Sequence, residues 1–252
     1  MKITFLGTSA GIPDPDRHCS STMIEVGERV YIIDAGAPLL DCLRKQGLLM
    51  DRANADRIAA VFTTHAHSDH IAGLLQFLSA SNWFFRTSSF DVFLTKDHLG
   101  DKLIECIELM DMLPFSERLK IHRAHVGVVY DDGILRATYI PTKHCLPDES
   151  YAILIEAEGK RVLFSGDLSH NLEENDLPAI LWETDLDLFV CEMAHFTPAH
   201  LAPYLDACRA KDVRINHFCP PQKIEQTALL AKEKQYPFPI TFLRDGDIVE
   251  WK

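Results

Sequence analysis

The sequence lacks the features that mark membrane, disulfide-rich and secreted proteins. None of its apolar runs approaches the ~18 residues that a membrane span requires, and its first residues, MKITFLGTS, lack the apolar segment of a signal peptide. Its 7 cysteines are an odd number without a framework spacing, which favours reduced thiols. We therefore expect a cytoplasmic protein that has neither disulfides nor a membrane anchor.

Positive charge is also scarce. The chain has 25 Lys and Arg against 37 Asp and Glu, a formal net charge of −12. This excess repels long nucleic acids and anionic membranes, so neither is expected as a partner. Bound divalent ions would return positive charge to one pocket, which leaves a small anionic substrate compatible with the composition.

Low-complexity stretches, short repeats and Pro/Ser-rich linkers are missing as well. The 252 residues, of which 47% are hydrophobic, are enough to bury a substantial core. The simplest expectation is a single domain over residues 1–252.

Apolar runs rich in β-branched residues alternate with segments of helical periodicity. The runs predict strands at 2–6, 21–26, 29–33, 59–63, 91–94, 134–140, 151–156, 161–164, 187–191, 213–216 and 247–250. The periodic segments predict helices near 38–47, 69–80, 98–110, 172–181, 198–210 and 222–235. Strand pairs interspersed with single helices favour an α/β fold with two sheets inside and helices outside, a four-layer αββα sandwich.

One segment concentrates metal-binding side chains. The strand at 59–63 leads into the sequence HAHSDH at 65–70, and a helix is predicted to follow. A tight loop at such a junction can direct three imidazoles and one carboxylate to one point, and these groups bind zinc, iron or manganese. The full pattern at a strand-to-helix junction is a strong indication of a metal site, whereas a bare HxH would be weak.

Further ligands should follow later strands, because one loop cannot surround two ions. His144 follows the strand at 134–140, Asp167 follows 161–164, and His217 follows 213–216. Each position alone would be an ordinary loop residue. Their common placement just beyond an apolar run predicts that they complete the site.

The motifs together resemble those of the metallo-β-lactamase superfamily, and within it the branch of ribonuclease Z and the cyclic-phosphate phosphodiesterases. The similar segments run through nearly the whole chain: FLGTS at 5–9, IIDAG at 32–36, HAHSDH at 65–70, His144, SGD at 165–167 and NHF at 216–218. The resemblance implies an αββα metallo-β-lactamase fold and two divalent metal ions, with Zn²⁺ expected and Mn²⁺ or Fe as alternatives.

The resemblance also implies a role for each ligand. The first metal ion would be bound by His65, His67 and His144, the second by Asp69, His70 and His217, and Asp167 would bridge the two. Asp34 would be a carboxylate that orients one ligand histidine, as metal-binding imidazoles usually require. The alternative for Asp34 is a turn residue at the end of a strand.

A hydrolase of this kind also needs a group that protonates the leaving oxygen, and histidine is the usual one. Asp69 can align the water that the metals activate. We expect His195 to be the acid, because a histidine followed by a threonine-capped helix occupies this place in the ribonuclease Z branch. His200, within that helix, is the rival, and Glu192 is a candidate partner of His195 or of a metal ligand.

The chain departs from transfer-RNA-processing ribonuclease Z in two ways. Only a short turn and two strands separate His144 from Asp167, which leaves no room for the RNA-gripping arm that many members insert there. The acidic charge balance also opposes RNA binding. The expected function is therefore hydrolysis of a small phosphodiester, a cyclic phosphate or nucleotide, by a hydroxide that two metal ions share.

Two other functions stay open. The same metal ions polarise the carbonyl of a lactone, thioester or β-lactam. A metal-bound sensor without turnover is the second alternative. Relatives of this kind are often dimers, so a homodimer is compatible with the sequence, although no sequence feature identifies an interface.

Overall fold

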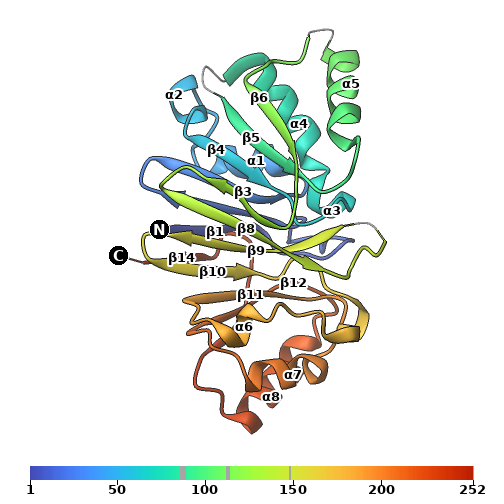
Figure 1. Ribbon diagram of the computed structural model, residues 1–252, viewed down its shortest axis with the longest axis vertical. Helices are drawn as coiled ribbons and strands as arrows, with labels where there is room; N and C mark the ends of the chain where they lie inside the picture. The colour runs from blue at the N-terminus through green and yellow to red at the C-terminus, as the bar shows by residue number, and fades with distance from the viewer. Residues whose placement is uncertain (86–88, 112–113, 148, 252) are drawn as a thin grey trace. The chain divides into compact units, whose positions relative to one another are not determined.

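A computed structural model describes residues 1–85, 89–111, 114–147 and 149–251. The chain forms two compact units, the first from residues 1–7, 11–124 and 245–252 and the second from 8–10 and 125–244 (Figure 1). Within the described residues each unit contains one seven-stranded mixed sheet and its own helices. The α/β class expected from the sequence is confirmed.

The first unit is built on the sheet of order β14-β1-β2-β3-β4-β5-β6. Its strands are β1 (Lys2–Gly7), β2 (Ser21–Val26), β3 (Arg29–Ala35), β4 (Ile58–Phe62), β5 (Phe90–Leu94), β6 (Leu119–Arg123) and β14 (Ile248–Glu250). Its helices are α1 (Leu39–Lys45), α2 (Arg52–Ala55), α3 (Ser68–Ile71), α4 (Gly73–Ala80), the π-helix η1 (Ser81–Phe85) and α5 (Leu99–Asp111).

The β3-to-β6 half of this sheet is parallel, and β3 and β4 read as nearly continuous apolar runs because they are buried. Helices α1, α4 and α5 pack on one face of the sheet (Figure 1). Leu43, Phe77 and Ile107 carry that contact, and all three are completely buried. Since β3 and β4 run in the same direction, the residues that follow them emerge at the same edge of the sheet.

The second unit is built on the sheet of order β13-β12-β11-β10-β9-β8-β7. Its strands are β7 (Gly127–Asp131), β8 (Leu135–Thr142), β9 (Ser150–Ala157), β10 (Lys160–Phe164), β11 (Leu188–Met193), β12 (Val213–Phe218) and β13 (Ile240–Phe242). Its helices are the 3-10 helix η2 (His170–Asn175), α6 (Ile180–Glu183), α7 (Pro198–Asp206) and α8 (Lys223–Lys234).

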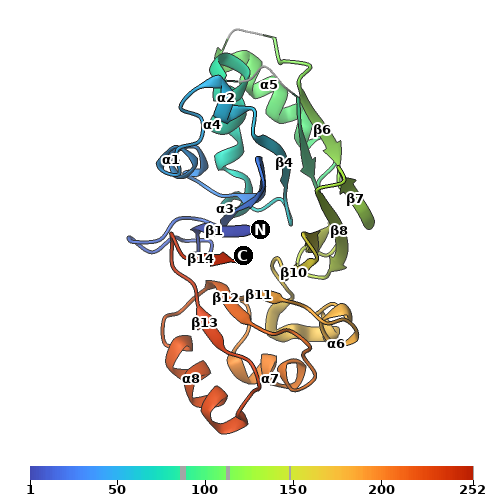
Figure 2. The same cartoon turned by 90° about the vertical axis from the view of Figure 1, so that its left-hand side faces the viewer.

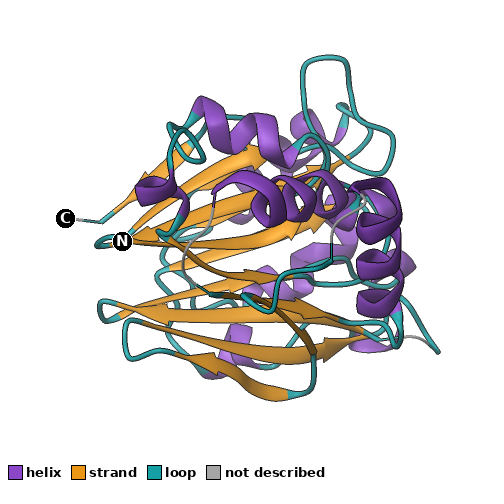
Figure 3. Ribbon diagram, turned by 90° about the horizontal axis from the view of Figure 1, so that it is seen from above, coloured by secondary structure: helices purple, strands orange, loops and turns teal. Residues whose placement is uncertain are grey.

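In this unit β10, β11, β12 and β13 are parallel, while β8 is antiparallel to β9 and β9 to β10. Strand β8 therefore runs in the same direction as β10, β11 and β12, and the carboxyl ends of these four strands share one edge. Helices α6, α7 and α8 lie against one face of the sheet (Figure 2). Figure 3 shows helices in purple beside the strands in orange.

The strands expected from the sequence are all present, with ends that differ by a residue or two. Strands β6, β7 and β13 were not predicted, because their short segments are only partly buried and lack a long apolar run. The helix expected near 172–181 is wrong. Asn171, Leu172 and Asn175 all have φ of 55°, a left-handed conformation that interrupts a helix, so η2 and α6 form instead.

The structure also bears on the expectations about disulfides and membrane spans. All the cysteines, from Cys19 to Cys219, are free thiols. In the part of the chain that the structure describes, every helix is too short or too polar to cross a membrane.

Candidate metal centre

The first unit brings the four ligand-type residues of the HAHSDH segment together where β4 ends. His65 follows the strand through Thr63 and Thr64, and Asp69 and His70 lie in α3. The His65 Nε2 atom is 3.0 Å from His67 Nδ1, and the His70 Nε2 atom is 3.4 Å from Asp69 Oδ2. The ring centroids of His65 and His70 are 4.1 Å apart. Two donor pairs, His65 with His67 and Asp69 with His70, thus lie side by side where β4 gives way to α3.

Asp34 orients the imidazoles of this cluster. Its Oδ2 atom is 2.7 Å from His70 Nδ1, and its Oδ1 atom accepts the Thr64 backbone N–H at 2.7 Å. The Thr64 hydroxyl contacts both Asp34 Oδ2, at 2.9 Å, and His65 Nδ1, at 3.1 Å. Because Asp34 engages His70 through Nδ1, the Nε2 atom is the one available to a metal ion. The expected orienting role of Asp34 is what this geometry supports.

Asp34 reaches His70 because β3 is bulged at this residue. Ser21 pairs with Ala35 and Thr22 with Ile33, so Asp34 has no partner of its own on β2 in the strand register. Its φ is 56°, in the left-handed region that aspartate tolerates better than most residues. A bulge re-aims a side chain and occurs often beside active sites.

In the second unit, three histidines surround Asp167. The Asp167 Oδ2 atom lies 3.2 Å from His217 Nε2, 3.7 Å from His144 Nε2 and 3.9 Å from His195 Nδ1. His144 follows β8, Asp167 follows β10, His195 follows β11 and His217 lies near the end of β12. They meet because the carboxyl ends of these strands share one edge of the sheet.

A hydrogen bond orients the ring of His144, and an unusual backbone conformation positions His217. His144 Nδ1 is 3.1 Å from the Leu168 carbonyl oxygen, to which it donates, so the Nε2 atom is the one that faces Asp167. His217 is the extra residue of a bulge, since Glu192 pairs with Asn216 and Met193 with Phe218. Its φ is 44°, a conformation that is uncommon for a residue other than glycine and recurs at functional sites.

Glu192 links His195 to the loop that carries Asp167. Its Oε1 atom is 2.8 Å from His195 Nδ1 and accepts the Leu168 N–H at 2.9 Å. Its Oε2 atom accepts the N–H groups of Ala194 and His195 at 2.6 and 3.1 Å. The Glu192 side chain is buried. A carboxylate on Nδ1 fixes the ring and leaves Nε2 as the atom that can exchange a proton with a ligand.

His200, the alternative acid, is exposed and belongs to the cap of α7. Thr197 is the N-cap residue of this helix, and its N–H donates to His200 Nδ1 at 3.2 Å. The Thr197 hydroxyl is 3.1 Å from the same atom. This imidazole takes the place that a Glu or Gln side chain occupies in a capping box.

Sequence reasoning missed Asp176, a buried carboxylate that ties two ligand loops together. Its Oδ1 atom accepts the Lys143 N–H at 2.7 Å, next to His144, and its Oδ2 atom accepts the Ser169 N–H at 2.6 Å. Burial raises the pKa of Asp176, while these hydrogen bonds oppose the shift. Nothing in the local sequence distinguishes this aspartate from a surface residue, because its contact with Lys143 joins residues that are 33 positions apart.

The donor chemistry of both clusters fits divalent metal ions. Each cluster combines imidazole nitrogen with carboxylate oxygen, a set that suits zinc and tolerates manganese or iron. His144, Asp167 and His195 present ligand atoms within 4.8 Å of one another inside the second unit. The first unit surrounds its cluster with the orienting contacts that metal-binding histidines typically have.

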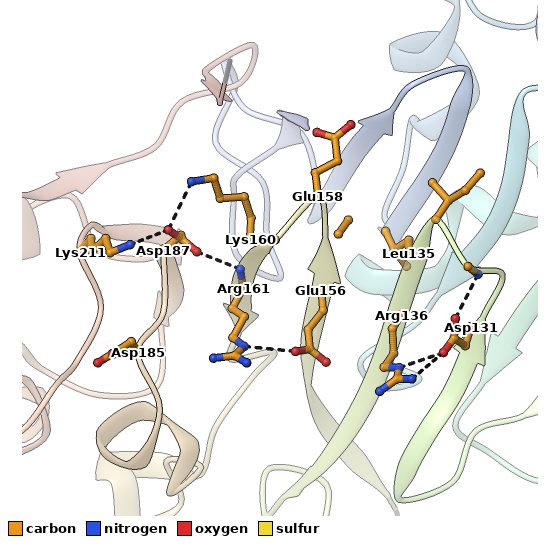
Figure 4. A pocket seen from close by; sticks show the side chains of 14 residues that line it. Asp131, Leu135, Arg136, Glu156, Glu158, Lys160, Arg161, Asp185, Asp187 and Lys211 are labelled. Atoms are coloured by element: carbon orange, nitrogen blue, oxygen red, sulfur yellow. Dashed lines mark hydrogen bonds and ion pairs between the residues drawn. The ribbon is translucent and has the colours of Figure 1, made fainter.

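A separate groove of about 620 Å³ lies at the other edge of the second sheet (Figure 4). It is lined where β8 begins, β9 ends and β10 begins, away from the carboxyl ends of β8 and β10. Its basic side chains are paired with acidic ones: Arg136 with Asp131 at 2.8 Å, Arg161 with Glu156 at 3.2 Å, and Lys211 with Asp187 at 2.9 Å. A groove with balanced, paired charges offers an anionic substrate little attraction.

Solved structures define the class of fold. The chain matches a metallo-β-lactamase fold protein, YhfI from Bacillus subtilis, with a TM-score of 0.74, 17% identity and 99% of both chains covered. It also matches the short form of human tRNase Z (ELAC1), with a TM-score of 0.73, 20% identity and 99% of both chains covered. These likenesses confirm the metallo-β-lactamase fold expected from the sequence.

Sequence comparison then defines the family. A family model described as anti-Pycsar protein Apyc1 matches residues 1–218. The chain therefore belongs to the Apyc1 family, within the ribonuclease Z-like branch of the metallo-β-lactamase superfamily. It is also 29% identical over 155 residues to a ribonuclease Z of Microcystis aeruginosa, a match that covers 61% of this chain and 46% of that enzyme. The chain thus spans about half the length of such curated relatives.

Proposed function

We propose that the chain is a metal-dependent hydrolase of a small phosphodiester, a cyclic phosphate or a nucleotide. The observation that carries the proposal is the cluster of the second unit. There the His195 imidazole is hydrogen-bonded to Glu192, and it lies close to Asp167, His144 and His217. Imidazole and carboxylate ligands serve any metallohydrolase. A carboxylate-held histidine beside them adds a group that can protonate a leaving alkoxide, which is the demanding step for an unactivated phosphodiester.

The ligand assignment is part of this proposal. His65, His67 and His144 would bind one divalent ion, Asp69, His70 and His217 the other, and Asp167 would bridge them. Zinc is the expected metal, because imidazole and carboxylate are ligands that it accepts readily, and manganese and iron are the alternatives. When bound, two such ions supply an activated water nucleophile and neutralise charge on the phosphate.

The side chains of the chain itself would perform the other tasks. Asp34 and Thr64 hold the rings of His70 and His65 in place. The Asp69 carboxylate aligns the attacking water. His195, with Nδ1 on Glu192, delivers a proton from Nε2 to the leaving oxygen. Positioned groups of this kind contribute about 10²- to 10⁴-fold to the rate of proton-transfer steps.

The net charge and the short segment between His144 and Asp167 favour a small substrate over RNA. The segment between His144 and Asp167 consists of a short loop and the strands β9 and β10. With a net charge of −12, the chain also offers little of the basic surface that binds a phosphate backbone.

The test is a substrate panel on protein whose metal content has been measured. The purified chain, reconstituted with zinc or manganese, is assayed with bis(p-nitrophenyl) phosphate, 2′,3′- and 3′,5′-cyclic nucleotides, a lactone, a thioester and a β-lactam. Turnover of the phosphodiesters, and of a cyclic nucleotide in particular, is the predicted result. Turnover confined to carbonyl substrates would assign the other hydrolase class, and fully loaded protein that turns over nothing would favour a sensor.

A further inference from the structure

A buried lysine forms hydrogen bonds with the backbone that precedes His195. The Lys223 Nζ atom, from the first turn of α8, donates to the carbonyl oxygens of Met193 and Ala194 at 2.7 and 2.8 Å. Lys223 is only 8% exposed. The segment that it contacts is where β11 leaves the sheet, at the bulge opposite His217.

Glu192 holds the amide groups of the same segment. Its Oε2 atom accepts hydrogen bonds from the N–H groups of Ala194 and His195. The ammonium therefore fixes two carbonyls and the carboxylate fixes two amides of three consecutive residues. With both sets of dipoles engaged, the peptide planes before His195 have little freedom to rotate. The His195 imidazole is thereby kept in hydrogen-bond contact with Glu192, with 2.8 Å between Nδ1 and Oε1.

Burying the Lys223 ammonium between α8 and β11 costs free energy. Burial lowers the pKa of Lys223, and the negative charge of Glu192 opposes that shift. An apolar side chain of the same length would fill the volume without the cost of burying an ammonium. The lysine provides instead two charge-assisted hydrogen bonds of defined direction, which are stronger than neutral ones.

We propose that Lys223 is a positioning residue for His195. Lys223 holds the Met193–Ala194 backbone so that the His195 ring remains on Glu192 and faces Asp167. The expected effect of Lys223 on turnover rests on the proposed function. Its expected effect on the position of the His195 ring rests on the geometry alone.

The matched variants are Lys223→Met, which keeps the length but donates no hydrogen bond, and Lys223→Gln, which keeps an N–H donor. Thr227→Val is the control. Thr227, one turn further along α8, is buried. Its hydroxyl donates to the Lys223 backbone carbonyl at 2.7 Å and contacts the Met193 sulfur at 3.5 Å, whereas the Met193 and Ala194 carbonyls accept from the Lys223 ammonium. All are assayed as metal-loaded protein, with one phosphodiester that has a poor alkyl leaving group and one that has an activated aryl leaving group.

We expect Lys223→Met to lower kcat for the poor leaving group by about 10- to 100-fold, and for the activated one by less than about 3-fold, because displacing an acid by about an ångström has such an effect. Lys223→Gln should recover part of the loss, and Thr227→Val should leave the ratio of the two rates unchanged. In a His195→Ala background, Lys223→Met should add less than about a 2-fold further loss, because it acts through that histidine.

A second readout needs no substrate. In ¹⁵N-histidine-labelled protein, the Nδ1–H signal that disappears in His195→Ala should shift or broaden in Lys223→Met and persist in Thr227→Val. If the signal is unchanged in Lys223→Met, the positioning role is wrong whatever the activity. If the signal moves but His195→Ala does not discriminate between leaving groups, the positioning role stands and the proposed acid function fails.

Discussion

At the scale of single residues, the two clusters depend on side chains that are aimed by unusual backbone. Asp34 and His217 each occupy the extra position of a bulge and have φ of 56° and 44°. Such conformations cost of the order of 1 to 3 kcal/mol when the residue is not glycine, and they persist where the surroundings dictate them. Both occur where a side chain must leave the plane of the sheet to reach a neighbouring strand end.

Asp34 offers a test that separates charge from backbone. Asparagine tolerates the left-handed conformation, so the substitution Asp34→Asn removes the charge that holds His70 while it keeps the bulge. We expect metal affinity to fall by about 10- to 100-fold, as for other partners of metal-binding histidines, with little loss of stability. Metal affinity measured by competition with a chelator checks this, and Asp34→Ala should lose stability as well. Wild-type affinity in Asp34→Asn would remove Asp34 from the metal centre.

His195 has a kinetic signature of its own. Replacement by alanine should leave metal content intact, because the proposed ligand set does not include this residue. Turnover of a substrate with a poor leaving group should fall by about 10²- to 10⁴-fold, and turnover of an activated one far less. Steady-state rates with the two substrates measure this difference. Equal losses for both would argue against an acid role, and a fall in metal content would make His195 a ligand.

At the scale of elements, the strands explain which residues of the candidate site could be predicted from the sequence and which could not. The HAHSDH segment and the positions of His144, Asp167 and His217 could be predicted because each follows a strongly apolar run, and those runs are strands. Asp176 and Lys223 could not, because each acts on backbone that is distant in sequence. The bulges at Asp34 and His217 also leave no local signal, since neither contains a glycine.

Gly36, just after β3, is required by close approach to the HAHSDH segment. A Cβ atom added there would clash with the Asp69 carbonyl oxygen and lie 2.7 Å from the Cys19 carbonyl carbon. Gly36→Ala should therefore displace the segment, destabilise the fold by about 1 to 3 kcal/mol as overpacking does, and reduce metal content. Urea unfolding and metal analysis measure the two effects.

Gly11→Ala is the matched control for this substitution. A Cβ atom at Gly11 would lie 3.6 Å from Asp69 Oδ2, an ordinary contact distance. This variant should fold and bind metal like the wild type. If Gly36→Ala behaved in the same way as Gly11→Ala, close packing at residue 36 would not control the position of the HAHSDH segment.

The segment after α8 gives a prediction about alkaline pH. Burial and the neighbouring Asp206 carboxylate raise the pKa of Tyr236 to about 12. Since the unfolded value is about 10, the phenol stabilises the fold fully below pH ~10, and this contribution disappears as pH rises toward 12. Urea unfolding at about pH 9 and about pH 11 should show a larger loss in wild type than in Tyr236→Phe. Equal losses would show that Tyr236 does not contribute.

At the scale of the whole molecule, the net charge of −12 gives a test of the proposed choice of substrate. A chain with this balance should not bind transfer RNA in the micromolar range at moderate salt, because neutralising phosphates requires basic side chains. Fluorescence anisotropy with a labelled precursor tRNA, together with a cleavage assay, tests this. An excess of the RNA should also leave hydrolysis of a small phosphodiester unaffected. Binding that weakens steeply with salt, or cleavage of the precursor, would contradict the small-substrate proposal.

The family and the fold leave one central claim to experiment, namely that the histidine and aspartate residues of the two units bind metal for hydrolysis. The most direct measurement is the metal content per chain after reconstitution with zinc, with turnover of bis(p-nitrophenyl) phosphate measured on the same sample. The account predicts about two metal ions per chain, a loss of at least one in Asp167→Ala, and turnover that follows metal occupancy. Protein that remains without metal after reconstitution with zinc, manganese and iron would contradict it.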